Sequence, residues 1–96
     1  MVAYAVAEVL VDDSVGFGQY AERMPPVLAK YGAKLIANDP APVTVEGKIR
    51  KGSLVVIEFP DKASAQAFYA DHDYVAAKKL REGAATLHVA IASGLD

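Results

Sequence analysis

Apolar positions in the first third of the chain follow a strand spacing and then a helical spacing. Residues 2–11 (VAYAVAEVLV) are nearly all apolar and rich in valine, which is typical of a strand. From residue 14 to residue 31, apolar and aromatic side chains recur every three or four positions, which predicts one helix. Pro25 and Pro26 predict a kink in this helix near Met24, because proline lacks the N–H group that the helix needs.

The remaining two thirds of the chain repeat the same alternation. The pattern predicts a short strand at 33–38 and a further extended segment at 43–47, either a continuation or a hairpin arm at the sheet edge. Residues 53–59 (SLVVIEF) are predicted to form the third main strand. Helical spacing returns after residue 60, breaks at 71–73 and resumes to about residue 84. Residues 86–92 form the last strand, with His88 on the face opposite to Leu87, Val89 and Ile91.

Residues suited to helix ends stand at the predicted boundaries. Asp13 or Ser14 would cap the first helix, because a short polar side chain accepts hydrogen bonds from the free N–H groups there. Asp61 would cap the second helix and Asp73 the segment that follows the break. Gly32 suits the left-handed position just past a helix end.

The predicted order of elements is βαββαβ with a broken second helix. An antiparallel sheet with helices on one face is the economical packing for this order, and it is the ferredoxin-like α+β architecture. The other face would be uncovered, yet strands 2–11 and 53–59 are apolar on both sides. Soluble monomers rarely expose such a patch, so we expect a homodimer in which two sheets pack face to face.

Length and composition indicate one domain without thiol chemistry. The chain has 96 residues, 53% of them hydrophobic, and we treat residues 1–96 as a single domain. It has no cysteine, which excludes a disulfide framework, a zinc-thiolate site and a thiol nucleophile. A formal net charge of -2 without a run of like charges gives no footprint for nucleic acid or an anionic membrane. No leader and no apolar stretch of about 18 residues is present, so we expect a cytoplasmic location.

The two histidines are candidates for proton transfer, because imidazole changes charge near neutral pH. His72 stands between two aspartates, which could orient its ring or simply cap the following helix. His88 lies mid-strand beside small residues, where it could project into a cavity or be a hydrogen-bonded structural residue. Glu8 and Glu58 lie on the corresponding strand faces. Strands in register would bring them to His88, and strand-edge exposure or an intersubunit ion pair is the alternative.

Aromatic residues gather on the predicted inner faces of the helices. Tyr20, Tyr31, Tyr69 and Tyr74 occur at helical spacing, which is typical of a core. The functional alternative is a pocket between helices and sheet whose phenols hydrogen-bond an aromatic or quinone-like ligand. Arg81 could hold a ligand carboxylate with two hydrogen bonds.

The alternative for Arg81 is an ion pair with Glu46 or Glu58. The sequence has no phosphate loop, dinucleotide fingerprint, nucleophile elbow or His-x-x-x-His metal pair.

A set of residues spread over nearly the whole chain occurs in the order of a known family pattern. These residues are Tyr20, Pro26, Tyr31-Gly32, Glu46-Gly47, Ile57-Glu58-Phe59-Pro60, Ala65, Phe68-Tyr69, Tyr74 and Leu80-Arg81. With them the sequence resembles domain-of-unknown-function family 1330. That family is similar to the dimeric α/β-barrel superfamily, which includes cofactor-independent oxygenases, haem-degrading monooxygenases and muconolactone isomerases. The resemblance implies the fold and the dimer, and it transfers no activity. His72 stands where such sequences often have proline, and Ala33 where a second glycine is usual.

Two function hypotheses of different classes follow. The first is a small cofactor-independent monooxygenase or isomerase that acts on a compact aromatic or lactone-like molecule, a hypothesis motivated by the barrel resemblance and by the tyrosine-rich inner faces of the helices. In it, Tyr20, Tyr69 and Tyr74 would position the substrate, His72 or His88 would move a proton, and Arg81 would hold an anionic group. The second is a non-catalytic dimer that binds a metabolite or serves as an assembly module. No cofactor or metal is predicted, and haem held by a single imidazole is a minor third variant.

Overall fold

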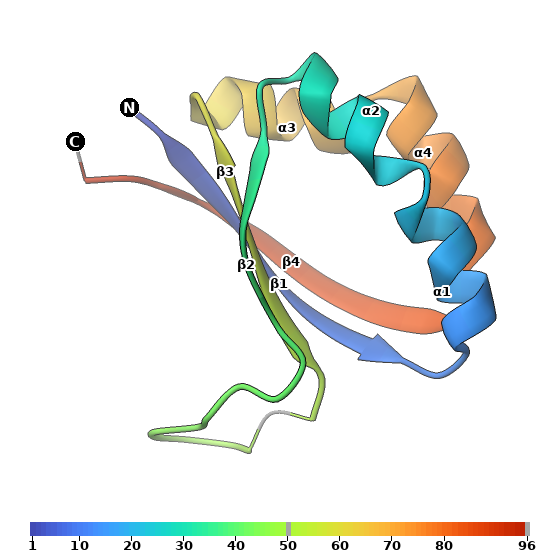
Figure 1. Cartoon of the computed structure of the whole chain (residues 1–96). Coiled ribbons are helices and arrows are strands. Elements are labelled where there is room, and N and C mark those ends of the chain that lie inside the picture. The colour runs from blue at the N-terminus through green and yellow to red at the C-terminus, as the bar shows by residue number, and fades with distance from the viewer. Residues whose placement is uncertain (50, 96) are drawn as a thin grey trace.

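Four strands form one sheet, and all the helices cover the same side of it (Figure 1). The computed structural model describes residues 1–49 and 51–95. Its elements are β1 (Ala3–Val11), α1 (Ser14–Ala21), α2 (Met24–Lys30), β2 (Lys34–Asp39), β3 (Ser53–Phe59), α3 (Lys62–Ala70), α4 (His72–Lys78), the 3₁₀ helix η1 (Lys79–Arg81) and β4 (Ala85–Ser93). The predicted ferredoxin-like α+β order, βαββαβ, is confirmed.

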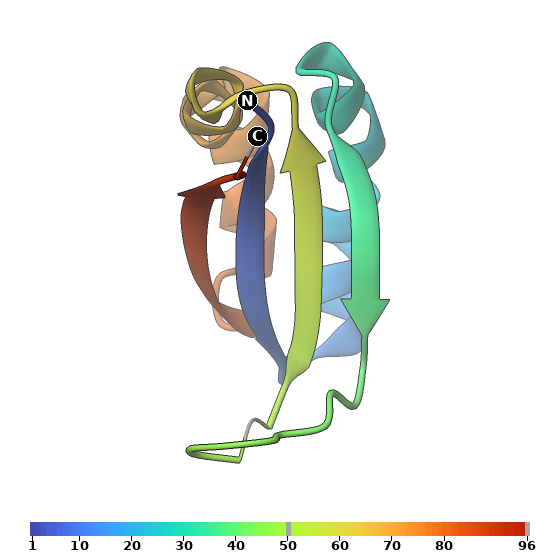
Figure 2. The same cartoon turned by 90° about the vertical axis from the view of Figure 1, so that its left-hand side faces the viewer.

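The strand order is β2-β3-β1-β4, and every neighbouring pair is antiparallel (Figure 2). Ala7 of β1 lies opposite Val55 of β3 and Val89 of β4, which fixes the register of the central strands. Because side chains alternate along a strand, Ala3, Ala5, Ala7 and Val9 of β1 face the helices and are buried, whereas Val11 at the end of the strand is exposed. The even-numbered residues form the other side, which we call the open face: Tyr4, Val6, Glu8 and Leu10 with their cross-strand partners Glu58, Val56, Leu54, Ala92, Ala90, His88 and Thr86.

Two of the predicted helix caps are present. The Asp13 carboxylate accepts a hydrogen bond from the Val15 N–H at 3.0 Å, and the Asp61 carboxylate accepts one from the Ser64 N–H at 2.6 Å. Hydrogen bonds from Ser64 hold the pKa of Asp61 below its usual value. Gly32 has a φ of 64°, the left-handed conformation expected just past the end of α2.

The predicted single helix with a kink near Met24 is wrong. Helix α1 ends at Ala21, and α2 begins at Met24 as a separate helix. Pro25 and Pro26 lie in the first turn of α2, where the N–H groups have no partner within the helix. The two prolines therefore start a helix instead of bending one.

The predicted extended segment at 43–47 forms no strand. Val43 and Val45 are 86% and 89% exposed, and residues 40–49 extend beyond the end of the sheet (Figure 1). The alternating Val-Thr-Val pattern favours a strand, but the strand pairs of the described chain do not include this segment. The predicted cap of the last helix is also off by two residues, since Asp71 caps α4 and accepts from the Asp73 N–H at 2.7 Å.

A small aromatic core joins the helices to the sheet. Phe59 and Phe68 are the largest fully buried side chains, and the alanines of β1 let the helices approach closely. Within the described residues, no helix is both long enough and apolar enough to cross a membrane.

Candidate small-molecule cavity

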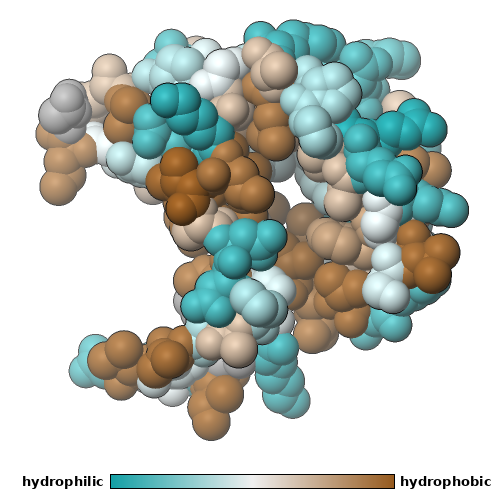
Figure 3. All heavy atoms as spheres, viewed as in Figure 1, coloured by the Kyte–Doolittle hydropathy of each residue, from teal (hydrophilic) through white to brown (hydrophobic). Residues whose placement is uncertain are grey.

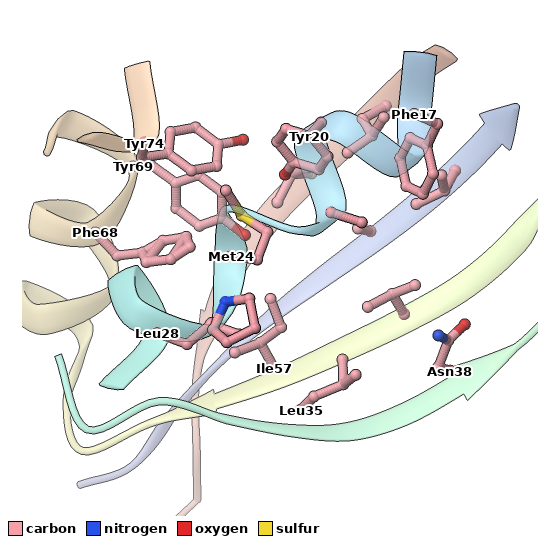
Figure 4. Close-up of a pocket in the computed structure, with 17 residues that line it drawn as sticks. Phe17, Tyr20, Met24, Leu28, Leu35, Asn38, Ile57, Phe68, Tyr69 and Tyr74 are labelled. Carbon is pink, nitrogen blue, oxygen red and sulfur yellow. The ribbon is translucent and has the colours of Figure 1, made fainter. Parts of the chain in front are cut away.

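A cavity of about 260 Å³ lies between the helices and the covered side of the sheet (Figure 4). Figure 3 shows its mouth as a hollow bordered by apolar residues. We call it the ring cavity because aromatic rings form one end of it. Its lining includes Phe17, Tyr20, Met24, Leu28, Leu35, Asn38, Ile57, Phe68, Tyr69 and Tyr74. Helices α1 and α2 form one wall, α3 and α4 the other, and the sheet forms the floor.

Three tyrosines from three helices meet at the aromatic end of the ring cavity. The rings of Tyr20 and Tyr74 pack edge to face with centroids 6.2 Å apart, and those of Tyr69 and Tyr74 do so at 5.0 Å. Phe68 packs edge to face on Tyr69 at 4.8 Å. Because each ring is held by a neighbour in a favourable geometry, the end of the cavity is pre-formed. Of the four tyrosines predicted on the inner helix faces, Tyr20, Tyr69 and Tyr74 line the cavity, whereas Tyr31 packs against the core outside the lining.

Arg81 lies behind these tyrosines and is only 8% exposed. Its Nη1 donates a hydrogen bond to the Tyr74 hydroxyl oxygen at 3.1 Å, and its Cζ lies 4.6 Å from the centre of the Tyr20 ring. Arg81 is outside the cavity lining, so a direct two-bond contact with a ligand does not fit this arrangement. No ion pair with Glu46 or Glu58 forms in the part of the chain that is described.

The Tyr20 and Tyr69 phenols of the ring cavity stay protonated at neutral pH. Burial raises the pKa of Tyr20, and repulsion from Tyr74 together with a hydrogen bond to it raises this pKa further. Burial also raises the pKa of Tyr69. Both groups are therefore hydroxyls, able to donate one hydrogen bond each.

The two histidines lie outside the ring cavity. His72 is exposed at the start of α4, directly after the capping Asp71. His88 lies on the open face opposite Glu8, beside a shallow hollow of about 290 Å³. The register thus brings Glu8 and His88 together, whereas Glu58 lies opposite Tyr4 and Lys34, several residues away along the strands. A role in proton transfer stays a prediction for both histidines.

A charged cluster that the sequence did not indicate ties α2 to the junction of α3 and α4. The Tyr31 hydroxyl donates to the Asp71 carboxylate at 2.5 Å, and the Lys30 Nζ lies 3.0 Å from Asp71 and 3.1 Å from Asp73. Hydrogen bonds from Tyr31 and Lys30 hold the pKa of Asp71 well below its usual range. The same contacts raise the pKa of Lys30 and of Tyr31. The partners are about 40 positions apart, so no local pattern could have revealed the contact.

Residues 1–49 and 51–95 contain no candidate metal-binding site. No group of three or more histidines, cysteines, aspartates or glutamates there could hold a metal ion.

Fold and cavity together define the class of protein: a ferredoxin-like α+β domain with helices on one side of the sheet and an aromatic-ended cavity between the layers. The chain belongs to the family described as "Domain of unknown function (DUF1330)", whose model matches residues 2–95. No curated protein matches the sequence.

Solved structures share this fold at low sequence identity. A protein of unknown function from Rhodopseudomonas palustris is 16% identical with a TM-score of 0.79, and the match covers 99% of this chain and 83% of that one. SnoaB, a cofactor-independent oxygenase from Streptomyces nogalater, is 11% identical with a TM-score of 0.65, covering 99% and 94%. A dimeric ferredoxin-like protein of unknown function from Bacteroides fragilis is 12% identical with a TM-score of 0.62, covering 97% and 96%.

Proposed function

We propose that the protein binds a compact, mostly apolar ring compound that carries oxygen at its edge, and that it holds this compound in the ring cavity. The observation that carries the proposal is the composition of the cavity lining. Apolar side chains line nearly all of the cavity, and three phenols lie at one end of it. Small-molecule sites in proteins combine apolar walls with a few placed polar groups in this way. A volume of about 260 Å³ suits a molecule of one or two rings.

The lining favours binding without catalysis as the first function. Its polar side chains are the three tyrosines and Asn38, and no carboxylate, imidazole or amine is among them. General acid–base chemistry needs a titrating group within hydrogen-bond reach of the substrate. Participation of His72 or His88 would require these side chains to reach a cavity that they do not line.

A cofactor-independent oxygenase is the second candidate, supported by the fold that the chain shares with SnoaB. In such a reaction the substrate supplies the electrons itself. A ring CH₂ group and O₂ become a ring C=O group and water, so one oxygen atom enters the substrate and the two hydrogens leave with the other. This chemistry asks the protein mainly to bind and orient an electron-rich ring, which the ring cavity suits.

A thermal-shift screen with one- and two-ring phenols, quinones and lactones tests these functions. We expect at least one compound to raise the melting temperature and to be recovered unchanged by mass spectrometry. Oxygen uptake with formation of a ketone or quinone would establish the oxygenase instead. Ala21→Phe, which places a ring at the cavity lining, should abolish the stabilisation, whereas Ala76→Phe on the outer side of α4 should keep it. Equal stabilisation of both variants would refute binding in the ring cavity.

We also propose that two copies associate through their open faces. The support is the apolar character of this face, where Val6 and Leu10 are exposed, together with the dimeric state of the structural neighbour from Bacteroides fragilis. Burial of such a patch contributes about 25 cal/mol per Å² before the loss of freedom on association is subtracted.

A further inference from the structure

We infer that the ring cavity selects ligands whose edge oxygen is an anion, and that Arg81 provides this selectivity through the hydroxyl of Tyr74. The inference rests on the proposed binding function and specifies the class of ligand: a ring compound bearing a phenolate, an enolate or a carboxylate.

The first observation is that Arg81 is a buried positive charge with no negative partner among residues 1–49 and 51–95. Charged side chains are almost never buried unless an opposite charge pairs with them. Arg81 is 8% exposed, and its contacts are a hydroxyl oxygen and the face of an aromatic ring. Asp71 and Asp73 form ion pairs with Lys30, and no described carboxylate forms one with Arg81. A negative charge at the aromatic end of the cavity would therefore complete a pair that the protein leaves open.

The second observation is the position of Tyr74 between Arg81 and the cavity. Its ring lines the cavity, and its oxygen accepts the Arg81 hydrogen bond at 3.1 Å. A hydroxyl that accepts a bond from a charged donor becomes a stronger donor itself, because hydrogen bonds in a chain polarise one another. The Tyr74 hydrogen is thus suited to an anionic oxygen. Arg81 is a positioning residue in this arrangement, since it acts on the ligand only through Tyr74.

The other phenols fit the same ligand. Tyr20 and Tyr69 stand at the same end of the cavity, as Figure 4 shows, and both stay protonated; the Tyr69 hydroxyl can donate to the ligand, while the Tyr20 hydroxyl donates to Tyr74. An anionic oxygen there would accept from the Tyr69 hydroxyl and from the Tyr74 hydroxyl that Arg81 polarises, with no carboxylate in the lining to repel it. A neutral oxygen would gain the hydrogen bonds but not the charge interaction, and this difference produces the selectivity.

The test uses 4-nitrophenol, whose phenolate absorbs visible light, with nitrobenzene as a neutral analogue of similar shape. We expect the pKa of 4-nitrophenol to be lower by at least about one unit in the bound than in the free compound. This shift corresponds to about tenfold tighter binding of the phenolate than of the neutral phenol. In Arg81→Met and in Tyr74→Phe, this shift should disappear while nitrobenzene still binds. Lys79→Met removes an exposed positive charge from the same 3₁₀ helix and should keep the full shift.

The outcomes separate this inference from the proposed function. If neither compound binds the wild-type protein, binding in the ring cavity is refuted and the selectivity with it. If both bind but the pKa of 4-nitrophenol does not fall, the anion selectivity is overturned and the binding function stands. A full shift in folded Arg81→Met, with folding checked by circular dichroism, would equally overturn the role of Arg81. Tyr74→Phe retains the buried ring and gives the answer should Arg81→Met fail to fold.

Discussion

At the scale of single residues, Asp71 is the point where three helices are joined. Its carboxylate caps α4, accepts a hydrogen bond from the Tyr31 hydroxyl and forms an ion pair with Lys30. The carboxylate of the neighbouring Asp73 contacts only Lys30. A carboxylate with a lowered pKa stabilises the folded state above the pKa of the unfolded chain. This stabilisation is lost as the pH falls toward the folded pKa.

Asp71→Asn should therefore lower the urea midpoint at pH 7, because the ion pair with Lys30 is lost while an amide oxygen can still cap α4. The difference from wild type should shrink below about pH 4, where unfolded aspartate becomes protonated. Asp73→Asn, in which only an exposed contact is removed, should change the midpoint much less at either pH. A difference between Asp71→Asn and wild type that stays constant from pH 7 to pH 3 would contradict the assignment.

Sequence reasoning at this scale found the tyrosines but not their connections. Helical spacing placed Tyr20, Tyr69 and Tyr74 on inner faces, because a buried stripe repeats every turn. The Tyr74–Arg81 contact spans seven residues, two helical turns, so the pattern contained a usable signal for it. The bond from Tyr31 to Asp71 depends on how α2 packs beside α4, and spacing along the chain has no information about that packing.

At the scale of elements, the packing of α1 depends on one of its two glycines. A Cβ atom on Gly16 would lie 2.8 Å from the Ala84 Cβ, closer than atoms in contact allow, whereas a Cβ on Gly18 would meet nothing within 4 Å. The Ala84 carbonyl also accepts hydrogen bonds from the Asp12 and Asp13 N–H groups at 2.7 and 2.9 Å. The start of α1 is therefore fixed tightly against the turn before β4.

Gly18→Ala should stabilise the protein by about 0.5–1 kcal/mol, since alanine loses less backbone freedom in a helix. Gly16→Ala gains the same propensity but should lower stability by about 1–3 kcal/mol, because the extra methyl group overpacks the contact with Ala84. The two changes alter composition identically, so each is the control for the other. Urea denaturation measures both, and equal effects would show that α1 does not pack on the turn as described.

The elements that could be predicted are those with a regular spacing of apolar residues and a capping or turn residue at the boundary. Strand β3 and the Asp61 cap of α3 were predicted at their observed positions, because alternation and capping are local effects. The break between α1 and α2 was missed, since Pro25-Pro26 is compatible with a kink and with a new first turn. Residues 43–47 were overpredicted because β propensity expresses packing against a partner strand, which the sequence cannot display.

At the scale of the whole molecule, the chain forms a slab of 34 × 32 × 16 Å. One layer of helices on one sheet accounts for the thin dimension, and Figure 2 shows the open face without a cover. A domain of this size buries only roughly 60–65% of its unfolded surface, so the proposed association through the open face would add substantially to its stability. The ring cavity lies on the other side of the sheet, so the proposed ligand binding and the proposed association would use different surfaces.

Val6→Lys should disrupt the proposed dimer while the single subunit stays folded. Val6 is at the centre of the open face, opposite Val56 and Ala90, and it is 39% exposed in one subunit, so lysine fits there without a partner copy. Burying its charge between two sheets should cost about 2 kcal/mol or more, which weakens association at least about 30-fold.

Val75→Lys is the matched control, because Val75 is 44% exposed on α4, away from the sheet. Sedimentation over a range of concentrations should give a dimer for wild type and Val75→Lys and a monomer for Val6→Lys. A wild-type protein that sediments as a monomer at all concentrations would refute association, and a Val6→Lys dimer as tight as wild type would move the interface away from the open face.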